Sequence, residues 1–211
     1  MSEAPEEGSV LVISAPSGAG KTTLCRRLLD EVPDLDFSVS HTTRAPREGE
    51  REAIDYHFVS QAAFESLRDQ GGFLEWARVA GQLYGTAHHS VRAALGQSRD
   101  VLLDIDTQGA AAVRRAIPDA VLIFILPPGP EALRARLEGR GSETPESLAR
   151  RLALARGEVE QAHLYDYLIV NDELAAAYDR LRSIVLAVRS RTARQKGRLE
   201  SIRRRFMEPA G

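Results

Sequence analysis

A glycine-rich segment followed by a lysine and two threonines is the strongest chemical signal in the chain. Its residues are Ala15, Pro16, Ser17, Gly18, Ala19, Gly20, Lys21, Thr22 and Thr23. Glycines let the backbone wrap so that its N–H groups point at phosphate oxygens, and a helix that starts at the lysine adds positive potential. Lys21 supplies a point charge for the β- and γ-phosphates, and the Thr22 hydroxyl can ligate Mg²⁺. The pattern predicts a nucleotide-binding phosphate loop, although Ala15 stands where the general pattern has Gly.

Two carboxylates, Asp104 and Asp106, lie at the end of the apolar run at residues 101–105. Such runs are typical of buried strands, and open parallel sheets bind ligands at the carboxyl ends of their strands. The two residues are therefore candidates for contacting a ligand or for supporting a magnesium ion through water. The alternative, in which they simply end a strand, stays open on the sequence alone.

The elements that position these residues alternate between apolar strands and helices. Strands are expected at residues 10–13, 36–41, 101–105, 121–126 and 167–170. Helices are expected from the phosphate loop to Val32, at 88–97, at 108–116, from 131 onwards with a new start at Thr144 and Pro145, and as one long helix from 172. This alternation predicts an α/β fold with a parallel sheet flanked by helices.

The residue pattern changes between Thr42 and Tyr84. A charged loop, a segment of alternating polar and apolar residues and an aromatic run predict a small antiparallel insertion there. The Arg-rich helical stretch from Glu131 is interrupted by a polar loop at 139–143 and forms a candidate lid. We therefore expect one domain over 1–211. Its core lies at about 9–35, 96–129 and 164–211, with the insertion at about 36–95 and the lid at about 130–163.

Composition excludes several classes of protein. The formal net charge of -2 argues against a chain that mainly neutralises a nucleic-acid backbone, and the basic stretch at 189–205 is best explained as a solvated helical face. A single cysteine, Cys25, excludes an intramolecular disulfide and fits a reducing cytosol. No stretch reaches the length of a membrane span. We expect a cytoplasmic protein that binds neither nucleic acid nor membrane, and we make no prediction of its oligomeric state.

Motifs along most of the chain resemble those of guanylate kinases, which are P-loop kinases of nucleoside monophosphates. They are the segments at 40–50 (SHTTRAPREGE), 55–58 (DYHF), 73–77 (FLEWA), 84–86 (YGT), 103–109 (LDIDTQG), 137–141 (LEGRG) and 169–172 (IVND). The similarity extends from about residue 10 to residue 188. It implies a P-loop kinase fold, with the insertion as the GMP-binding region and the helical lid closing over ATP.

The resemblance also implies an activity and a set of site residues. The activity is transfer of the γ-phosphoryl group of ATP to GMP, giving ADP and GDP, with Mg²⁺ present as Mg-ATP. The GMP phosphate would be held by Arg44, Arg47, Tyr56 and Tyr84, and the guanosine by Ser40, Glu75, Thr86, Asp104 and Asp106. ATP would be bound by residues 15–23 and Asn171, with Thr22 on the metal. Catalytic roles would fall to Lys21, Arg44, Arg136, Arg140 and Arg151.

The chemistry of these residue types agrees with the implied roles. Arginine presents a rigid fork of donors that suits phosphate oxygens. A carboxylate only accepts hydrogen bonds, and guanine offers two adjacent donors, N1–H and the 2-amino group, so Glu75 can accept both. Adenine would instead face Glu75 with a lone pair at N1. Ser40 and Thr86 hydroxyls can donate to O6, which adenine lacks.

Two other functions are weighed against this one. A protein-interaction module of similar fold that has lost catalysis would be expected to have a degraded phosphate loop, whereas Gly18, Gly20, Lys21 and Thr22 are all present. A P-loop kinase for AMP or a pyrimidine monophosphate would not need Glu75 beside Ser40 and Thr86. Both features favour a kinase that acts on GMP.

Overall fold

Five parallel strands form the central sheet of the computed structural model, which describes residues 8–79, 81–139 and 144–207. The strands are β1 (Val10–Ser14), β2 (Leu35–Phe37), β7 (Asp100–Asp104), β8 (Val121–Leu126) and β9 (Tyr167–Val170), in the order β2-β7-β1-β8-β9. All four pairings are parallel. Their carboxyl ends therefore share one edge, where β1 leads into the phosphate loop.

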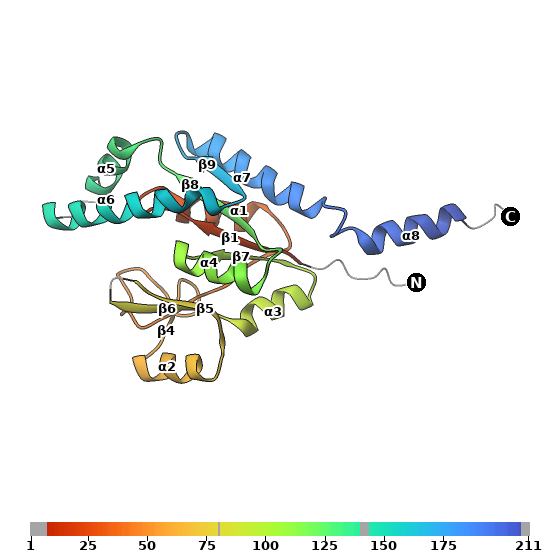
Figure 1. Cartoon of the computed structure of the whole chain (residues 1–211), viewed down its shortest axis with the longest axis horizontal. Helices are drawn as coiled ribbons and strands as arrows, with labels where there is room; N and C mark the ends of the chain where they lie inside the picture. The colour runs from red at the N-terminus through yellow and green to blue at the C-terminus, as the bar shows by residue number, and fades with distance from the viewer. Residues whose placement is uncertain (1–7, 80, 140–143, 208–211) are drawn as a thin grey trace.

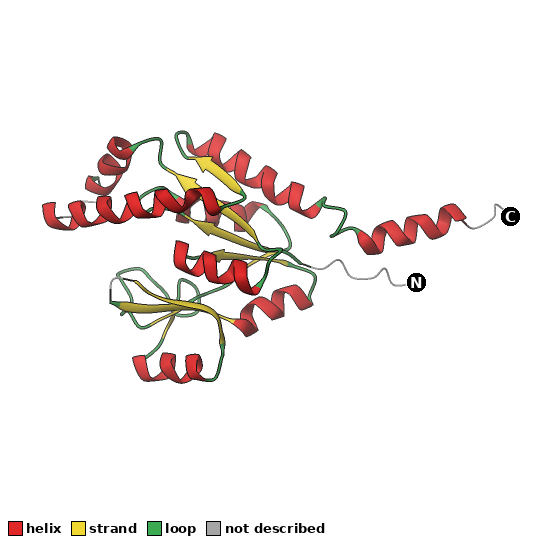
Figure 2. Cartoon of the chain, viewed as in Figure 1, coloured by secondary structure: helices red, strands yellow, loops and turns green. Residues whose placement is uncertain are grey.

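Helices cover both faces of this sheet, as the continuous apolar strands predict (Figure 2). On one face, α1 (Lys21–Glu31) and α7 (Leu174–Arg189) bury Leu24, Leu28 and Leu181 against β1 and β8. On the other face, α3 (His88–Gly96) and α4 (Thr107–Ala116) pack against β1 and β7. The α/β fold with a parallel sheet is confirmed.

A second, four-stranded sheet forms the insertion, in the order β4-β3-β6-β5. Its elements are β3 (His41–Thr42), β4 (His57–Phe58), α2 (Gln61–Asp69), β5 (Phe73–Val79) and β6 (Gln82–Ala87). The pairs β3–β6 and β5–β6 are antiparallel, as expected for the small antiparallel insertion, whereas β3 and β4 are parallel. The connection between them is long enough to return the chain in the same direction, which a hairpin cannot do.

The single strand expected at 36–41 is also wrong, because the chain changes sheets within it. Leu35–Phe37 pairs with β7 in the parallel sheet, and His41–Thr42 pairs with β4 and β6 in the insertion. Alternating side chains fit either sheet equally well. The pattern therefore identifies extended backbone but not the partner strand.

The candidate lid consists of α5 (Pro130–Glu138) and α6 (Pro145–Glu160), followed by a 3-10 turn at Gln161–Leu164. Thr144 caps α6 as predicted, because its side chain accepts a hydrogen bond from the Ser147 N–H. The two helices share a small apolar cluster of their own, made of Leu133, Leu137, Leu148, Leu152 and Ala155. Figure 1 shows this pair and the insertion on either side of the edge where β1 ends.

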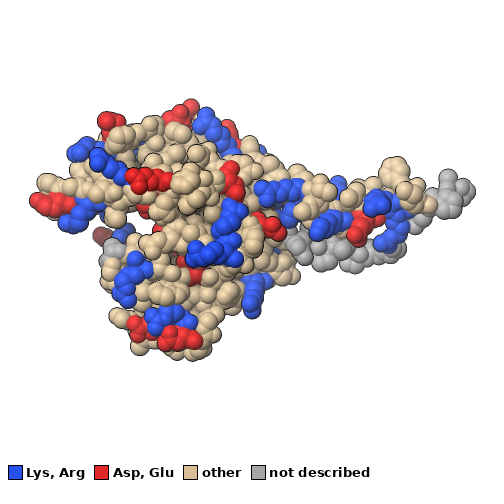
Figure 3. All heavy atoms as spheres, viewed as in Figure 1, with Lys and Arg blue, Asp and Glu red and all other residues tan. Residues whose placement is uncertain are grey.

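The predicted long terminal helix is wrong, because α7 ends at Arg189 and a separate helix, α8 (Lys196–Met207), follows. Tyr178, Leu181 and Val185 of α7 are buried, whereas Leu174 is exposed. No residue of α8 is buried, and the helix projects from the body with basic side chains along it (Figures 1 and 3). None of the helices in the described part of the chain combines the length and apolarity that crossing a membrane requires.

Asp100 anchors the end of α7 to the central sheet. Its side chain is 2% exposed and accepts hydrogen bonds from Arg189 Nε at 2.7 Å and from Arg194 Nη1 at 2.8 Å. It also accepts from the Ser9 backbone N–H at 2.7 Å. One buried carboxylate thus ties together the start of β1, the start of β7 and the turn after α7.

We expect Asp100→Asn to lower the free energy of unfolding by about 2 kcal/mol, because two arginines lose their buried anion. Chemical denaturation at pH 7 measures this. Asp119→Asn, at an exposed turn position, is the matched control and should change stability by less than about 0.5 kcal/mol. Equal stability of both variants would contradict a structural role for Asp100.

Candidate active site

The phosphate loop connects Ser14, the last residue of β1, to Lys21, the first residue of α1. Gly18 and Gly20 have φ values of 96° and 94°, which L-residues with a side chain rarely adopt. The Asn171 side chain also lies where a Cβ on Gly20 would be. Both glycines are therefore required by the loop, whereas Ala15 is accommodated as a partly buried residue against the core.

Asn171 and Arg136 support the loop from outside. The Asn171 side-chain amide donates to the Ala19 carbonyl at 2.7 Å, and the asparagine is 4% exposed. Arg136 of α5 donates to the Asn171 carbonyl at 2.7 Å and to the Ala19 carbonyl at 3.4 Å. The resemblance to guanylate kinases implies roles for these residues toward ATP, and the structure adds that both bind the backbone of the loop.

Lys21 forms an ion pair with Asp104 at the end of β7. Burial disfavours the charged ammonium group, but the Asp104 charge and hydrogen bond outweigh this and raise the pKa of Lys21. Thr22 and Thr23 follow at the exposed start of α1. A cation and two hydroxyl groups thus surround the N-terminus of a helix, which is a suitable environment for phosphate.

The structure separates Asp106 from Asp104. Asp106 is the N-cap of α4, and its Oδ1 accepts the Gly109 N–H at 2.8 Å, whereas Asp104 faces Lys21.

Glu158 of α6 is a partly buried carboxylate that the sequence did not single out. Burial raises its pKa to about 7, the Lys21 charge opposes this rise, and the Asp106 charge adds to it. The lid therefore places an acidic group near the loop lysine.

Arg44 lies at the centre of a polar and aromatic cluster in the insertion. Its Nε donates to the Tyr84 hydroxyl at 3.3 Å, and its guanidinium lies 5.4 Å from the Tyr56 ring centroid. Glu50 accepts from Arg44 Nη2 at 2.9 Å and, with its other oxygen, from the Arg47 backbone N–H at 2.7 Å. This hydrogen bond to Glu50 raises the pKa of Arg44. Glu50 belongs to the motif at 40–50, but only the fold reveals that it orients the arginine loop.

Glu75 and Thr86 face each other across the β5–β6 pair. The Thr86 hydroxyl donates to Glu75 Oε1 at 2.6 Å, and both residues are buried. The Thr86 hydroxyl therefore donates to Glu75 in this structure, whereas the sequence predicted that it donates to O6 of guanine. Burial raises the pKa of Glu75 to about 7, the hydrogen bond from Thr86 opposes the rise, and the Asp106 charge adds to it.

The two halves of the site converge near Tyr56. Burial raises the pKa of the Tyr56 hydroxyl, and the charges of both Asp104 and Lys21 act on it. An insertion residue thus lies close to the phosphate loop. Ser40 is buried beside β3 and Arg47 is exposed on its loop.

Two lid arginines complete the predicted set. Arg151 is a partly buried residue of α6, on the helix that also carries Glu158. Arg140 lies outside the described residues.

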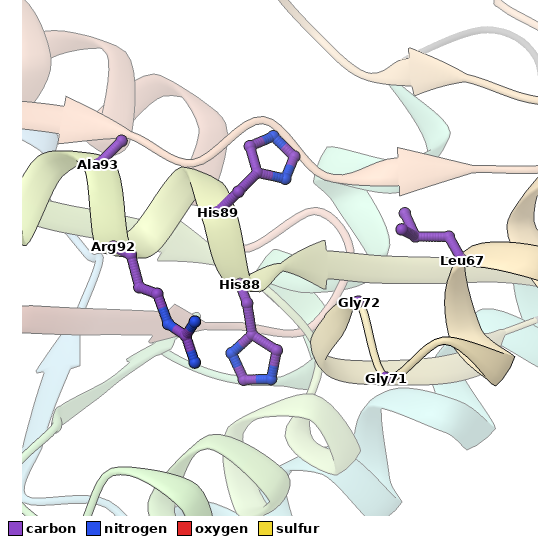
Figure 4. A pocket seen from close by; sticks show the side chains of 7 residues that line it. All are labelled: Leu67, Gly71, Gly72, His88, His89, Arg92 and Ala93. Atoms are coloured by element: carbon purple, nitrogen blue, oxygen red, sulfur yellow. The ribbon is translucent and has the colours of Figure 1, made fainter.

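A separate pocket lies between the end of α2 and α3. It is lined by Leu67, Gly71, Gly72, His88, His89, Arg92 and Ala93 (Figure 4). None of these is a predicted site residue. His88 and His89 point away from each other, as expected for neighbours on a helix (Figure 4). Within the described ranges, no group of three or more His, Cys, Asp or Glu side chains is arranged to hold a metal ion.

Comparisons with known proteins agree with this geometry. The guanylate kinase family model matches residues 7–188. A guanylate kinase from Syntrophotalea carbinolica is 50% identical over 198 residues, covering 92% of this chain and 94% of the relative. One from Neisseria meningitidis serogroup A is 53% identical over 191 residues, covering 90% of this chain and 93% of the relative.

Solved structures give the same result. The crystal structure of guanylate kinase from Anaplasma phagocytophilum has a TM-score of 0.80 and 34% identity, covering 97% of this chain and 98% of that one. The SH3-kinase fragment of tight junction protein 3 has a TM-score of 0.50 and 16% identity, covering 92% of this chain and 61% of that one, which shows a shared fold alone. The phosphate loop, the arginine cluster and these matches lead to one conclusion: the chain belongs to the guanylate kinase family.

Proposed function

We propose that this kinase transfers the γ-phosphoryl group of ATP to GMP by holding the two nucleotides against opposite sides of the Lys21–Asp104 pair. The observation that carries the proposal is the convergence of the phosphate loop with the Arg44, Tyr56 and Tyr84 cluster at Asp104. ATP phosphates bind the loop backbone and Lys21. The phosphate of GMP binds the cluster, so donor and acceptor meet in line.

Arg44 and Tyr84 act as the acceptor clamp in this proposal, joined by Arg47 and Tyr56. Glu50, the Tyr84 hydroxyl and the Ala45 carbonyl each accept a hydrogen bond from Arg44, and the N–H donors of its fork that these bonds do not use are left for a phosphate. No general base is required, since a phosphate monoester with a second pKa of about 6 is largely a dianion at pH 7. The clamp therefore has two functions, which are to orient the nucleophilic oxygen and to reduce its repulsion toward ATP.

The proposed base site is centred on Glu75. Its Oε1 is fixed by Thr86, and the carboxylate can accept the N1–H and 2-amino protons of guanine. Ser40, buried at the start of the insertion, supplies a hydroxyl donor for O6. Adenine offers no matching donor at N1, so a buried carboxylate at this position excludes it.

Magnesium fits the loop through one protein ligand. Guanylate kinases normally use Mg-ATP, and the exposed Thr22 hydroxyl at the start of α1 is an oxygen ligand of the type that Mg²⁺ prefers. Mg²⁺ characteristically takes few protein ligands beside phosphates and waters, so one hydroxyl is sufficient. When bound, the metal neutralises charge on the ATP phosphates.

The lid supplies the remaining charges and excludes water. Arg136 already contacts the loop, and Leu133 and Leu137 of α5 pack beside Gly18. In this proposal Arg151 and Arg140 approach ATP when the lid closes, and they stabilise charge on the migrating phosphoryl group. The units of this movement are the core at about 9–35, 96–129 and 164–211, the insertion at about 36–95 and the lid at about 130–163. We place the enzyme in the cytoplasm, consistent with the free, buried Cys25.

ADP release from Mg-ATP, measured with GMP, AMP, CMP and UMP supplied separately, tests the proposal. We expect rapid release with GMP and at least about 100-fold lower kcat/KM with the other three. Comparable rates with AMP would contradict the assignment of Glu75. Absence of turnover with every acceptor, from folded protein, would favour the interaction-module alternative.

A further inference from the structure

Gly109 stands in the first turn of α4, where its backbone does not need a glycine. Its φ is not positive, unlike those of Gly18 and Gly20, and it continues as ordinary helix. Glycine is a poor helix former because it loses more backbone entropy on folding than other residues. A neighbouring side chain that leaves no room for a Cβ would explain the glycine.

The side chain that approaches is Glu75, across the junction between core and insertion. A Cβ on Gly109 would lie 2.8 Å from Glu75 Oε2 and 3.2 Å from its Cδ. It would also lie 3.3 Å from Ile105 Cδ1. The contact with Oε2 is shorter than real Cβ atoms make, so an added methyl group requires the carboxylate or the helix to move.

The carboxylate cannot move freely. Its other oxygen, Oε1, accepts the Thr86 hydroxyl at 2.6 Å, and Glu75 is only 6% exposed. The N–H of Gly109 is in turn held by Asp106 at 2.8 Å, which fixes the first turn of α4. Glu75 is thus confined between a hydrogen bond on β6 and the bare backbone of α4.

We infer that Gly109 is a positioning residue for guanine recognition, because its missing side chain sets where the Glu75 carboxylate stands. This inference rests on the proposed role of Glu75 in the base site. Any side chain at position 109 displaces the carboxylate from the 2-amino group of the base. The substrate preference that depends on this group is GMP over IMP, since IMP keeps N1–H and O6 but has no 2-amino group.

The experiment compares Gly109→Ala with Gly96→Ala by steady-state kinetics with GMP, IMP and ATP. Gly96 is a helical glycine of α3, and a Cβ added there would have no atom within 4 Å, so Gly96→Ala is the matched control. For Gly109→Ala we expect kcat/KM for GMP to fall at least about tenfold and the GMP-to-IMP ratio to fall with it. The KM for ATP should stay within about twofold, because the phosphate loop is untouched.

A double-mutant cycle separates positioning from damage to the helix. Glu75→Ala removes the carboxylate, so adding Gly109→Ala to it should leave the GMP-to-IMP ratio unchanged. If Gly109→Ala alone unfolds, restoration of a native thermal transition in the double variant supports the same steric conflict. An equal loss of stability in both backgrounds would overturn it.

Two further outcomes distinguish failure of the inference about Gly109 from failure of the proposed base site. If Glu75→Gln lowers GMP selectivity but Gly109→Ala behaves like Gly96→Ala, the inference about Gly109 is overturned and the base site stands. If Glu75→Gln leaves GMP kinetics unchanged, the proposed base site itself fails.

Discussion

Lys21→Ala is expected to lower kcat for ADP formation from ATP and GMP at least about 1,000-fold, while the protein stays folded. Phosphoryl transfer depends on positioning and on neutralising charge at the migrating group, and a single basic residue at that position contributes on this scale. Lys21 is the first residue of α1, in contact with Asp104 at the neighbouring strand end. No other lysine is available as a substitute, because the one other lysine is Lys196 in α8.

The matched control for this prediction is Lys196→Ala. It makes the same chemical change at the start of a helix that contributes no buried residue. We expect wild-type kcat and KM for this variant. In Lys21→Ala, binding of GMP should change by less than about threefold, since the proposed acceptor clamp is made by Arg44 and Tyr84 and does not include Lys21. Turnover near the wild-type rate would refute the assigned role of the phosphate loop.

Glu75→Gln is expected to lower kcat/KM for GMP about 100-fold with little change in the KM for ATP. Glutamine keeps the size of the side chain but replaces one acceptor oxygen by a donor NH₂ group, which then faces a donor of guanine. Glu65→Gln, on α2 of the same insertion, is the control and should behave as wild type. An equal effect of Glu75→Gln on the KM values for ATP and GMP would indicate general damage instead of lost recognition.

The raised pKa of Glu75 makes two further consequences of this substitution measurable. Ionisation is needed for Glu75 to accept both guanine donors, so the ratio of wild-type to Glu75→Gln kcat/KM for GMP should fall as pH drops below about 7. Taking this ratio cancels the titration of the GMP phosphate, which both enzymes share. A ratio that is constant between pH 5.5 and 8 would contradict recognition by the ionised carboxylate.

The free energy of unfolding should fall as pH rises, whereas the kcat/KM ratio should increase. The folded pKa of Glu75, about 7, lies above the ordinary value of 4.5, so the folded state binds the proton more tightly than the unfolded state. The stabilising contribution is present in full below pH 4.5 and is lost as pH rises through 7. Relative to Glu75→Gln, the wild type should therefore lose on the order of 3 kcal/mol between pH 4.5 and pH 8. Denaturant titrations of both proteins across this range measure the difference.

The local elements could largely be predicted from the sequence. The strands Val121–Leu126 and Tyr167–Val170, the start of α6 after Thr144 and the loop between β1 and α1 depend on short-range features. These features are apolar runs, a capping side chain, and glycines with a lysine at fixed spacing. Residues a few positions apart determine them, so local pattern is sufficient.

Predictions about which segments pair or contact each other in three dimensions were less successful. Residues 36–41 were expected to form one strand and instead divide between two sheets, because alternation does not identify the strand that supplies the hydrogen bonds. The terminal helix ends at Arg189, where a carboxylate 89 positions earlier binds it. In both cases the segment contacts a distant part of the chain, which local pattern does not reveal.

The sequence by itself determined the parallel α/β architecture, the phosphate loop and the kinds of side chain available to bind two nucleotides. Only the tertiary structure decided how those side chains are used. It pairs Lys21 with Asp104, joins Arg44 to Glu50, and places the carboxylate of Glu75 against the backbone of Gly109. The physical reason is that a residue type fixes charge and hydrogen-bonding capacity, whereas burial and contact depend on which segments the fold brings together.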